Sequence, residues 1–138
     1  MNSVPPVPAV GVICFRGDQV LLIRRGRAPR AGQWSIPGGR VEPGERMQDT
    51  AHRELFEETG VRAELLGLVD VVDGVFPEID RHYVLIDYAA RWREGEPRPG
   101  DDAAEAVFLP IDQACDRVDW EETRRVIRLA AARFLTTM

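Results

Sequence analysis

Three glutamates, Glu54, Glu57 and Glu58, occupy positions i, i+3 and i+4 of a segment with helical periodicity. This spacing places all three carboxylates on one side of a helix. Like charges at such spacing destabilise a helix by about 0.2–0.5 kcal/mol per pair. Arg53 can offset only part of that repulsion, through Glu57 four residues later, so a divalent cation is the expected further compensation. A solvated acidic helix face is the structural alternative.

The helix is predicted over residues 46–59, with Asp49 near its positive end and Gly60 as a left-handed C-terminal stop. An apolar stripe on the overlapping and adjoining face consists of Met47, Ala51 and Leu55. The three acids are therefore expected at the edge of the core rather than on the far, solvated side.

A glycine pair, Gly38-Gly39, comes before this helix and leaves the backbone bare at that point. A carbonyl there can ligate a metal, and a phosphate can approach without obstruction by a side chain. Clustered carboxylates are hard oxygen ligands, which favour Mg²⁺ or Mn²⁺ over zinc. A glycine loop followed by convergent carboxylates indicates a site for a metal-bridged polyphosphate.

The distribution of charge supports a small anionic ligand rather than a nucleic acid polymer. The chain has 18 basic residues, all of them arginine, against 23 acidic ones, for a formal net charge of −5. Residues 42–58 alone contain six acids and two arginines. The absence of lysine excludes Schiff-base chemistry and a P-loop lysine, and the acidic excess argues against a general DNA- or RNA-binding surface.

The rest of the chain alternates predicted strands with one more helix, which indicates one α/β domain over residues 1–138 with a mixed sheet covered on both faces. Gly17-Asp18 is predicted to join the first two strands as a hairpin. Strands are predicted at 8–16, 19–24, 61–73, 82–92 and about 105–109, a loop at 25–39, a turn at 74–81 and a helix at 119–135.

Residues 39–61, GRVEPGERMQDTAHRELFEETGV, resemble the Nudix box, G-x5-E-x7-R-E-U-x-E-E-x-G-U, where U is aliphatic. The resemblance implies the Nudix fold, an α/β/α sandwich around a mixed β-sheet. It also implies hydrolysis of the pyrophosphate bond of a nucleoside diphosphate derivative with Mg²⁺, or possible Mn²⁺, as the cofactor. Every defined position of the box is filled, by Gly39, Glu45, Arg53, Glu54, Leu55, Glu57, Glu58, Gly60 and Val61.

The same resemblance implies roles for individual residues. The metal ligands are expected to be Glu54, Glu57, Glu58 and the carbonyl of Gly39, while Glu45 and Arg53 are expected to be structural. The general base is expected to be Glu54 or Glu57. Asp102 and Glu105, on a later loop, are the next candidates for the base, and this loop is also where an extra metal-binding acid is expected. A polar loop with no such function is the alternative for that segment.

Substrate contacts are expected from arginines and an aromatic cluster. Arg24 and Arg27 are the expected phosphate clamps, because a guanidinium pairs with phosphate in two-pronged geometry. Phe76 and His82 resemble a stretch near the substrate in members that cleave nucleoside triphosphates. ADP-ribose-like nucleotides and (d)NTPs both remain open as substrates. Sanitisers of oxidised guanine in this family contact the base with an asparagine in the region just before the last helix. That region has no asparagine here, and the only one in the sequence is Asn2, which weakens that assignment.

A non-catalytic nucleotide sensor with the Nudix fold is the main alternative function, and an acidic protein-docking helix is a third. The retained box glutamates favour the enzyme. Cys14 and Cys115 form no predicted disulfide or zinc motif, and no segment is long and apolar enough for a membrane span. We therefore expect a cytoplasmic protein with a small-molecule nucleotide substrate, no nucleic acid polymer and no membrane partner, and a possible homodimer by resemblance.

Overall fold

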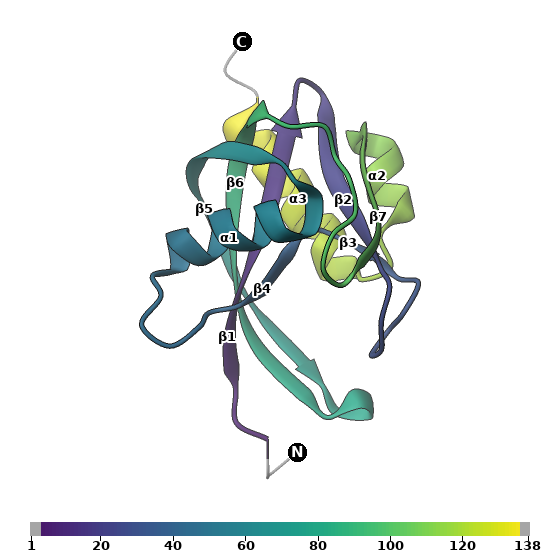
Figure 1. The fold of residues 1–138 in the computed structure, drawn as a ribbon. Coiled ribbons are helices and arrows are strands. Elements are labelled where there is room, and N and C mark those ends of the chain that lie inside the picture. Colours follow the sequence, from purple (N-terminus) through teal and green to yellow (C-terminus); the bar gives the residue numbers. More distant parts are fainter. Residues whose placement is uncertain (1–3, 136–138) are drawn as a thin grey trace.

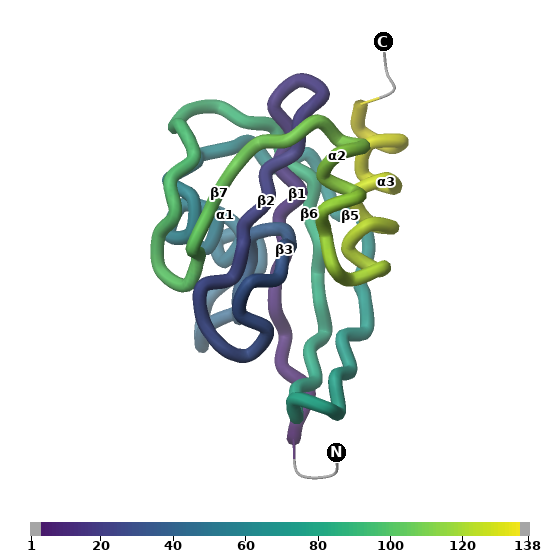
Figure 2. The backbone as a smooth tube through the Cα atoms, turned by 90° about the vertical axis from the view of Figure 1, so that its right-hand side faces the viewer, coloured from purple at the N-terminus to yellow at the C-terminus, as the bar shows by residue number. Residues whose placement is uncertain are grey.

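The computed structural model describes residues 4–135, and within that range seven strands form one mixed sheet between two layers of helix. Helix α1 covers one face of the sheet, and α2 and α3 cover the other (Figure 1). The three layers are separated most clearly in the turned view (Figure 2). The elements are β1 (Val7–Arg16), β2 (Gln19–Arg25), β3 (Trp34–Ser35), β4 (Gly38–Arg40), α1 (Met47–Thr59), β5 (Arg62–Phe76), a 3-10 turn (Pro77–Ile79), β6 (Arg81–Glu94), β7 (Ala103–Pro110), α2 (Ile111–Arg117) and α3 (Glu121–Phe134).

Strand β1 is the centre of the sheet, which has the order β3-β2-β1-β6-β5. β1 runs parallel to β6 and antiparallel to β2, but it pairs with β2 only next to their hairpin. Farther from the hairpin, the short strand β4 pairs with β1 instead, from Ala9 to Gly11, while β7 pairs along β2. The divergence of β1 and β2 therefore places Gly38 and Gly39 beside the middle of the sheet, under α1.

Two hydrophobic cores hold the layers together. One lies between the sheet and helices α2 and α3, and the other lies between the sheet and α1. Ala51 and Leu55 anchor α1 in the second core, with 0% and 1% of their surface exposed. The prediction was wrong for Met47, which is 45% exposed because it is the first residue of α1 and lies outside the packed part of the helix.

Most predicted elements are confirmed, and the mixed α/β sandwich is among them. Gly60 ends α1 with φ of 73°, the left-handed conformation that glycine adopts without steric cost. The predicted loop over 25–39 was partly wrong, because it contains β3 and part of β4, and the predicted turn over 74–81 narrows to Pro77–Ile79 and its neighbours. Helix α2 was not predicted.

Two other expectations concern the cysteines and membrane segments. Cys14 and Cys115 are both free and buried. None of the helices in the described part of the chain has the length and apolar character that crossing a membrane requires.

Substitution of Leu55 tests whether its packing holds α1 on the sheet. We expect Leu55→Ala to lower the free energy of unfolding by about 2–5 kcal/mol, because it leaves a cavity in the core under α1. Met47→Ala is the matched control on the same helix, and we expect it to change stability by less than about 0.5 kcal/mol. Urea unfolding followed by circular dichroism measures both, and equal losses in the two variants would contradict this packing.

Candidate active site

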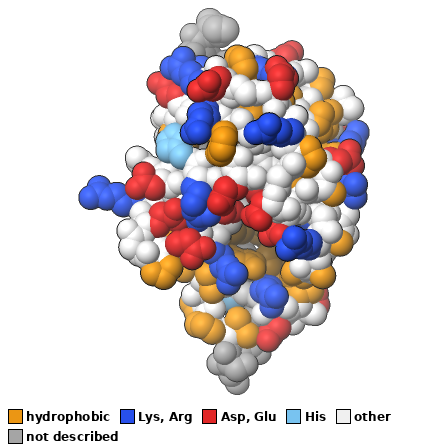
Figure 3. Space-filling model, viewed as in Figure 1, with side chains coloured by type: hydrophobic (Ala, Val, Ile, Leu, Met, Phe, Trp, Pro, Cys, Tyr) orange, Lys and Arg blue, Asp and Glu red, His pale blue; other side chains and the backbone are white. Residues whose placement is uncertain are grey.

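A cleft of about 990 Å³ runs from the acidic side of α1, past Gly38 and Gly39, to the inner surface of β6 and the start of α3. This size matches pockets that bind small molecules. On the face that shows α1, acidic and arginine side chains gather across the middle, and a hollow with apolar side chains lies below them (Figure 3). The cleft therefore combines a charged end with an apolar end.

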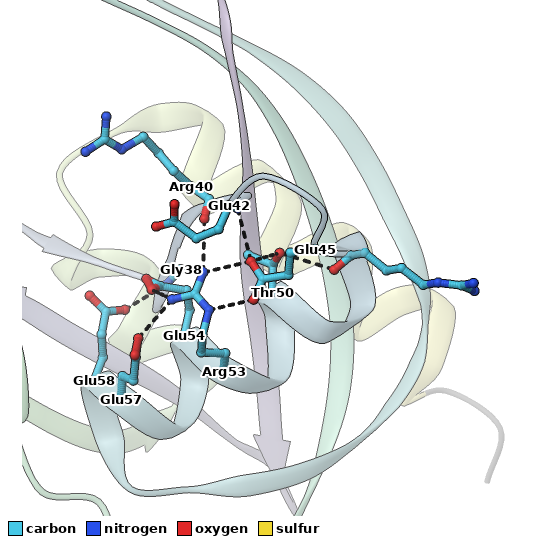
Figure 4. A network of polar contacts seen from close by, with 10 residues as sticks. Gly38, Arg40, Glu42, Glu45, Thr50, Arg53, Glu54, Glu57 and Glu58 are labelled. Atoms are coloured by element: carbon cyan, nitrogen blue, oxygen red, sulfur yellow. Dashed lines mark hydrogen bonds and ion pairs between the residues drawn. The ribbon is translucent and has the colours of Figure 1, made fainter.

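The guanidinium of Arg53 organises the charged end of the cleft (Figure 4). Its Nε and one Nη2 hydrogen donate to the two carboxylate oxygens of Glu45, at 2.6 and 2.9 Å. Its Nη1 donates to Glu54 at 2.7 Å and to Glu57 at 2.9 Å, and Nη2 also donates to the carbonyl oxygen of Arg40 at 3.1 Å. A guanidinium has five N–H groups, so Arg53 has none left for a substrate and acts as a positioning residue.

Glu45 completes this network from the loop before α1. Its Oε1 also accepts hydrogen bonds from the Thr50 hydroxyl at 2.7 Å and from the Glu42 N–H at 3.1 Å. The hydrogen bond from Arg53, followed by those from Thr50 and Glu42, lowers the pKa of Glu45 to about 2. Glu45 is therefore an anion fully engaged in hydrogen bonds that fix the loop to the helix.

Glu54 and Glu58 are buried carboxylates, 9% and 5% exposed. Burial is the main reason that the pKa of Glu54 rises to about 7 and that of Glu58 to about 8, although Arg53 and the Gly38 N–H respectively oppose the rise. The Gly38 N–H donates to Glu58 Oε1 at 2.8 Å. A Cβ at Gly39 would lie 1.8 Å from Glu54 Oε2, so only glycine fits against this carboxylate.

The donor set at the charged end suits a hard cation. Glu54, Glu57 and Glu58 offer only oxygen atoms, two of these side chains are buried without a fully compensating charge, and the bare backbone of Gly39 adjoins them. Their predicted convergence is not seen in the side-chain arrangement of residues 4–135, where no three His, Cys, Asp or Glu residues form a metal-sized group. The reason is that Arg53 draws Glu54 and Glu57 toward itself, while Glu58 turns to Gly38.

The predicted substrate residues are divided between the cleft and the surface outside it. Phe76, His82 and Asp102 line the cleft. Arg24, Arg27 and Glu105 are not among its lining residues: Arg24 pairs with Glu105, and Arg27 lies 3.3 Å from Asp102. The arginines that do line the cleft are Arg25, Arg30, Arg40, Arg53 and Arg81.

Aromatic side chains form one wall of the apolar end. The rings of Phe76 and Trp120 meet edge to face, with centroids 5.1 Å apart and planes at 67°. The guanidinium of Arg30 lies over the Phe76 ring, 4.8 Å from its centroid, and pairs with Glu78. Such cation–π and edge-to-face contacts hold aromatic rings in defined orientations, so this wall is fixed before any ligand arrives.

Sequence reasoning did not single out Asp87 as a residue of the cleft. It lies in the middle of β6, is 5% exposed and lines the apolar end. Burial raises its pKa to about 7. Its signal in the sequence is a single acid within the apolar stretch Tyr83 to Ala90, since a charged residue at an inward strand position is expensive to bury.

The model of the NUDIX domain matches residues 5–130, which is most of the chain. The chain belongs to the Nudix family. A MutT NUDIX hydrolase from Burkholderia pseudomallei superimposes with a TM-score of 0.78 at 30% identity, over 91% of this chain and 98% of that one. The Nudix box resemblance found in the sequence is thereby confirmed at the level of family and fold.

Two curated relatives indicate the breadth of the family. An ADP-ribose pyrophosphatase from Methanocaldococcus jannaschii is 35% identical over 111 residues, which are 78% of this chain and 63% of that protein. An 8-oxo-(d)GTP phosphatase from Mycolicibacterium smegmatis is 33% identical over 110 residues, covering 80% of this chain and 33% of that protein. The chain thus spans between a third and two thirds of the length of these two relatives.

The buried carboxylates make the stability of this Nudix protein depend on pH. Asp87 has a higher pKa in the folded chain than its ordinary value of 3.8, so the native state retains a proton that the unfolded state has lost. The free energy of unfolding in EDTA should therefore fall as the pH rises from about 4 to 7, by roughly 1.4 kcal/mol per pH unit for each such proton. Asp87→Asn should make this decline shallower.

Chemical denaturation at pH 4, 5, 6 and 7 measures the decline. Asp73→Asn is the matched control, because Asp73 is an exposed residue of β5, and it should keep the wild-type slope. An Asp87→Asn variant with an unchanged slope would show that Asp87 does not retain a proton in the native state.

Proposed function

We propose that this Nudix protein hydrolyses the pyrophosphate bond of a nucleoside diphosphate derivative, with Mg²⁺ as the metal. The observation on which this rests is that two buried carboxylates, Glu54 and Glu58, lie next to the bare backbone at Gly39, at one end of a nucleotide-sized cleft. An acidic helix that served only for solubility or for docking would not bury its carboxylates and raise their pKa values.

The metal would be held by Glu54, Glu57, Glu58 and the carbonyl oxygen of Gly39. When bound, it would neutralise the pyrophosphate charge and lower the pKa of a water molecule, which supplies hydroxide near neutral pH. Arg53 would keep Glu54 and Glu57 on the cleft side of α1 through its Nη1. Arg53 would also keep the segment from Arg40 to Glu45 against the helix, so that this segment and the carboxylates of α1 stay in a fixed arrangement.

Proton transfer requires a carboxylate that a water molecule can reach. Glu57 has the most exposed side chain of the three, at 42%, and therefore becomes the first candidate for the general base. Glu54 is the second candidate, because its side chain is only 12% exposed. Asp102, which lines the cleft on a later loop, could supply an extra acid, whereas Glu105 pairs with Arg24 outside it.

The opposite end of the cleft suits the nucleoside part of a substrate. Phe76 and Trp120 offer aromatic surface, and His82 is nearby in the lining. Arg25 and Arg81 line the cleft and form no ion pair with an acidic side chain of the described residues, so they replace Arg24 and Arg27 in that proposed role. The relatives named for ADP-ribose and for 8-oxo-(d)GTP support a nucleotide substrate and leave both kinds as candidates.

A substrate panel tests this function. The purified chain is incubated with ADP-ribose and with each (d)NTP, in Mg²⁺ or in EDTA, and products are separated by anion exchange. We expect Mg²⁺-dependent cleavage, giving AMP plus ribose phosphate in the first case or NMP plus pyrophosphate in the second. Glu58→Gln should lower kcat by about 100-fold or more, since even groups that only support metal ligands contribute 10–100-fold.

Glu94→Gln is the matched control, because Glu94 is an exposed residue at the end of β6, remote from the cleft lining. It should keep wild-type activity. Full activity of Glu58→Gln would contradict the assigned metal site. Tight nucleotide binding with no turnover of any substrate would instead favour a Nudix-fold sensor.

A further inference from the structure

Asp87 is a buried carboxylate with no hydrogen bond or ion pair to any residue within 4–135. On β6 it shares a face with Leu85 and Ala89, which pack in the core beneath α2 and α3. Asp87 is one of the residues that line the cleft. A carboxylate in such a place loses its hydration without gaining a partner, which is costly unless a ligand supplies the missing donors.

The neighbouring strand is shaped to admit this carboxylate. Gly11 of β1 lies directly opposite Asp87 in the parallel ladder. A Cβ on Gly11 would lie 2.3 Å from Asp87 Oδ1 and 2.8 Å from Ile36 Cδ1. Glycine weakens a strand interior, so its presence here indicates that the space is needed by the Asp87 side chain.

The charged groups around Asp87 do not neutralise it. Asp70 lies opposite Asp87 on the neighbouring strand β5 and raises the pKa of Asp87, while Arg125 of α3 lowers it. Arg125 is already bound, to Asp70 at 2.8 Å and to Glu122 at 2.9 Å. Arg125, which lowers the pKa of Asp87, is therefore already bound to other acids, and the remaining candidates for a partner are donors that enter through the cleft.

The surroundings favour a flat, largely apolar ligand with N–H groups on one edge. Val72, Leu85 and Val126 line this end together with Ile36 and the aromatic pair of Phe76 and Trp120. Above its pKa of about 7, the Asp87 carboxylate is ionised and can accept with both oxygens, which suits two adjacent N–H donors. Among the common nucleobases, guanine presents such a pair, N1–H and N2–H, whereas hypoxanthine keeps N1–H alone and adenine has an acceptor at N1.

We propose that Asp87 is a specificity residue that accepts hydrogen bonds from N1–H and N2–H of a guanine-type base held in this cleft. The proposal rests on the proposed function for the place of the nucleotide, but it concerns binding of the base and not cleavage of the pyrophosphate. It also provides guanine recognition without an asparagine.

Binding of nucleoside monophosphates in EDTA at about pH 8, above the pKa of Asp87, tests the proposal without any hydrolysis. Isothermal titration calorimetry with GMP, IMP and AMP should show GMP binding the wild-type chain about 10-fold more tightly than IMP, and AMP more weakly than GMP. Asp87→Asn has nearly the same volume, and it should lower the GMP affinity about 10-fold while changing IMP and AMP less. Asp73→Asn, on the exposed side of β5, should leave all three affinities unchanged.

Equal affinity of the wild-type chain for GMP and IMP would overturn the proposal, and this comparison holds even if Asp87→Asn does not fold. A folded Asp87→Asn variant, verified by its thermal melt, that keeps the preference for GMP would overturn it as well. An equal loss of affinity for all three nucleotides in Asp87→Asn would place Asp87 against the ribose instead of the base, which also contradicts the proposal. A chain that selects GMP through Asp87 but hydrolyses no substrate would refute the proposed function and leave this inference intact.

Discussion

The five hydrogen bonds of Arg53 are the contacts on which the charged end of the cleft depends. They join the carbonyl of Arg40 at the end of β4, Glu45 in the following loop, and Glu54 and Glu57 on α1. A lysine could not replace this residue, because a single ammonium has three donors and no planar fork. The arginine thus fixes the distance between the glycine strand and the acidic helix.

The same region stores unfavourable electrostatic energy. Glu54 and Glu58 are buried on one side of α1, and burial raises the pKa values of both well above that of an exposed glutamate. Leu55, which lies between them in sequence, is buried in the core under the helix and keeps α1 on the sheet. Hydrophobic packing of α1 therefore keeps these two carboxylates buried despite the cost of removing them from water. Such an arrangement is expected of a site that binds a cation.

Much of this arrangement could be predicted from sequence because it is local. The spacing of Glu54, Glu57 and Glu58 determines their common face through helix periodicity alone, and Gly60 marks the end of the helix. The link from Arg53 to Glu57 follows from the same periodicity. The hairpin at Gly17-Asp18 was predictable for a similar reason, since short-range turn chemistry specifies it.

The parts that were not predicted depend on contacts between distant segments. β3 and β4 are only two and three residues long, and they form because β1 and β2 diverge. The choice of arginines that face the cleft depends on how the loop after β2 folds, which no local pattern encodes. The single acid in the apolar stretch of β6 can be seen in the sequence, but the space that Gly11 leaves for the Asp87 side chain depends on the pairing of β6 with β1.

Binding of Mn²⁺ is the most direct test of whether the acidic side of α1 is a metal site. Titration followed by electron paramagnetic resonance measures free Mn²⁺ without any assumption about the substrate. We expect the wild-type chain and Glu94→Gln to bind Mn²⁺ equally, and Glu54→Gln and Glu58→Gln to bind it at least about 10-fold more weakly. Equal binding by all four proteins would contradict the account, because the buried carboxylates would then have no part in holding the metal.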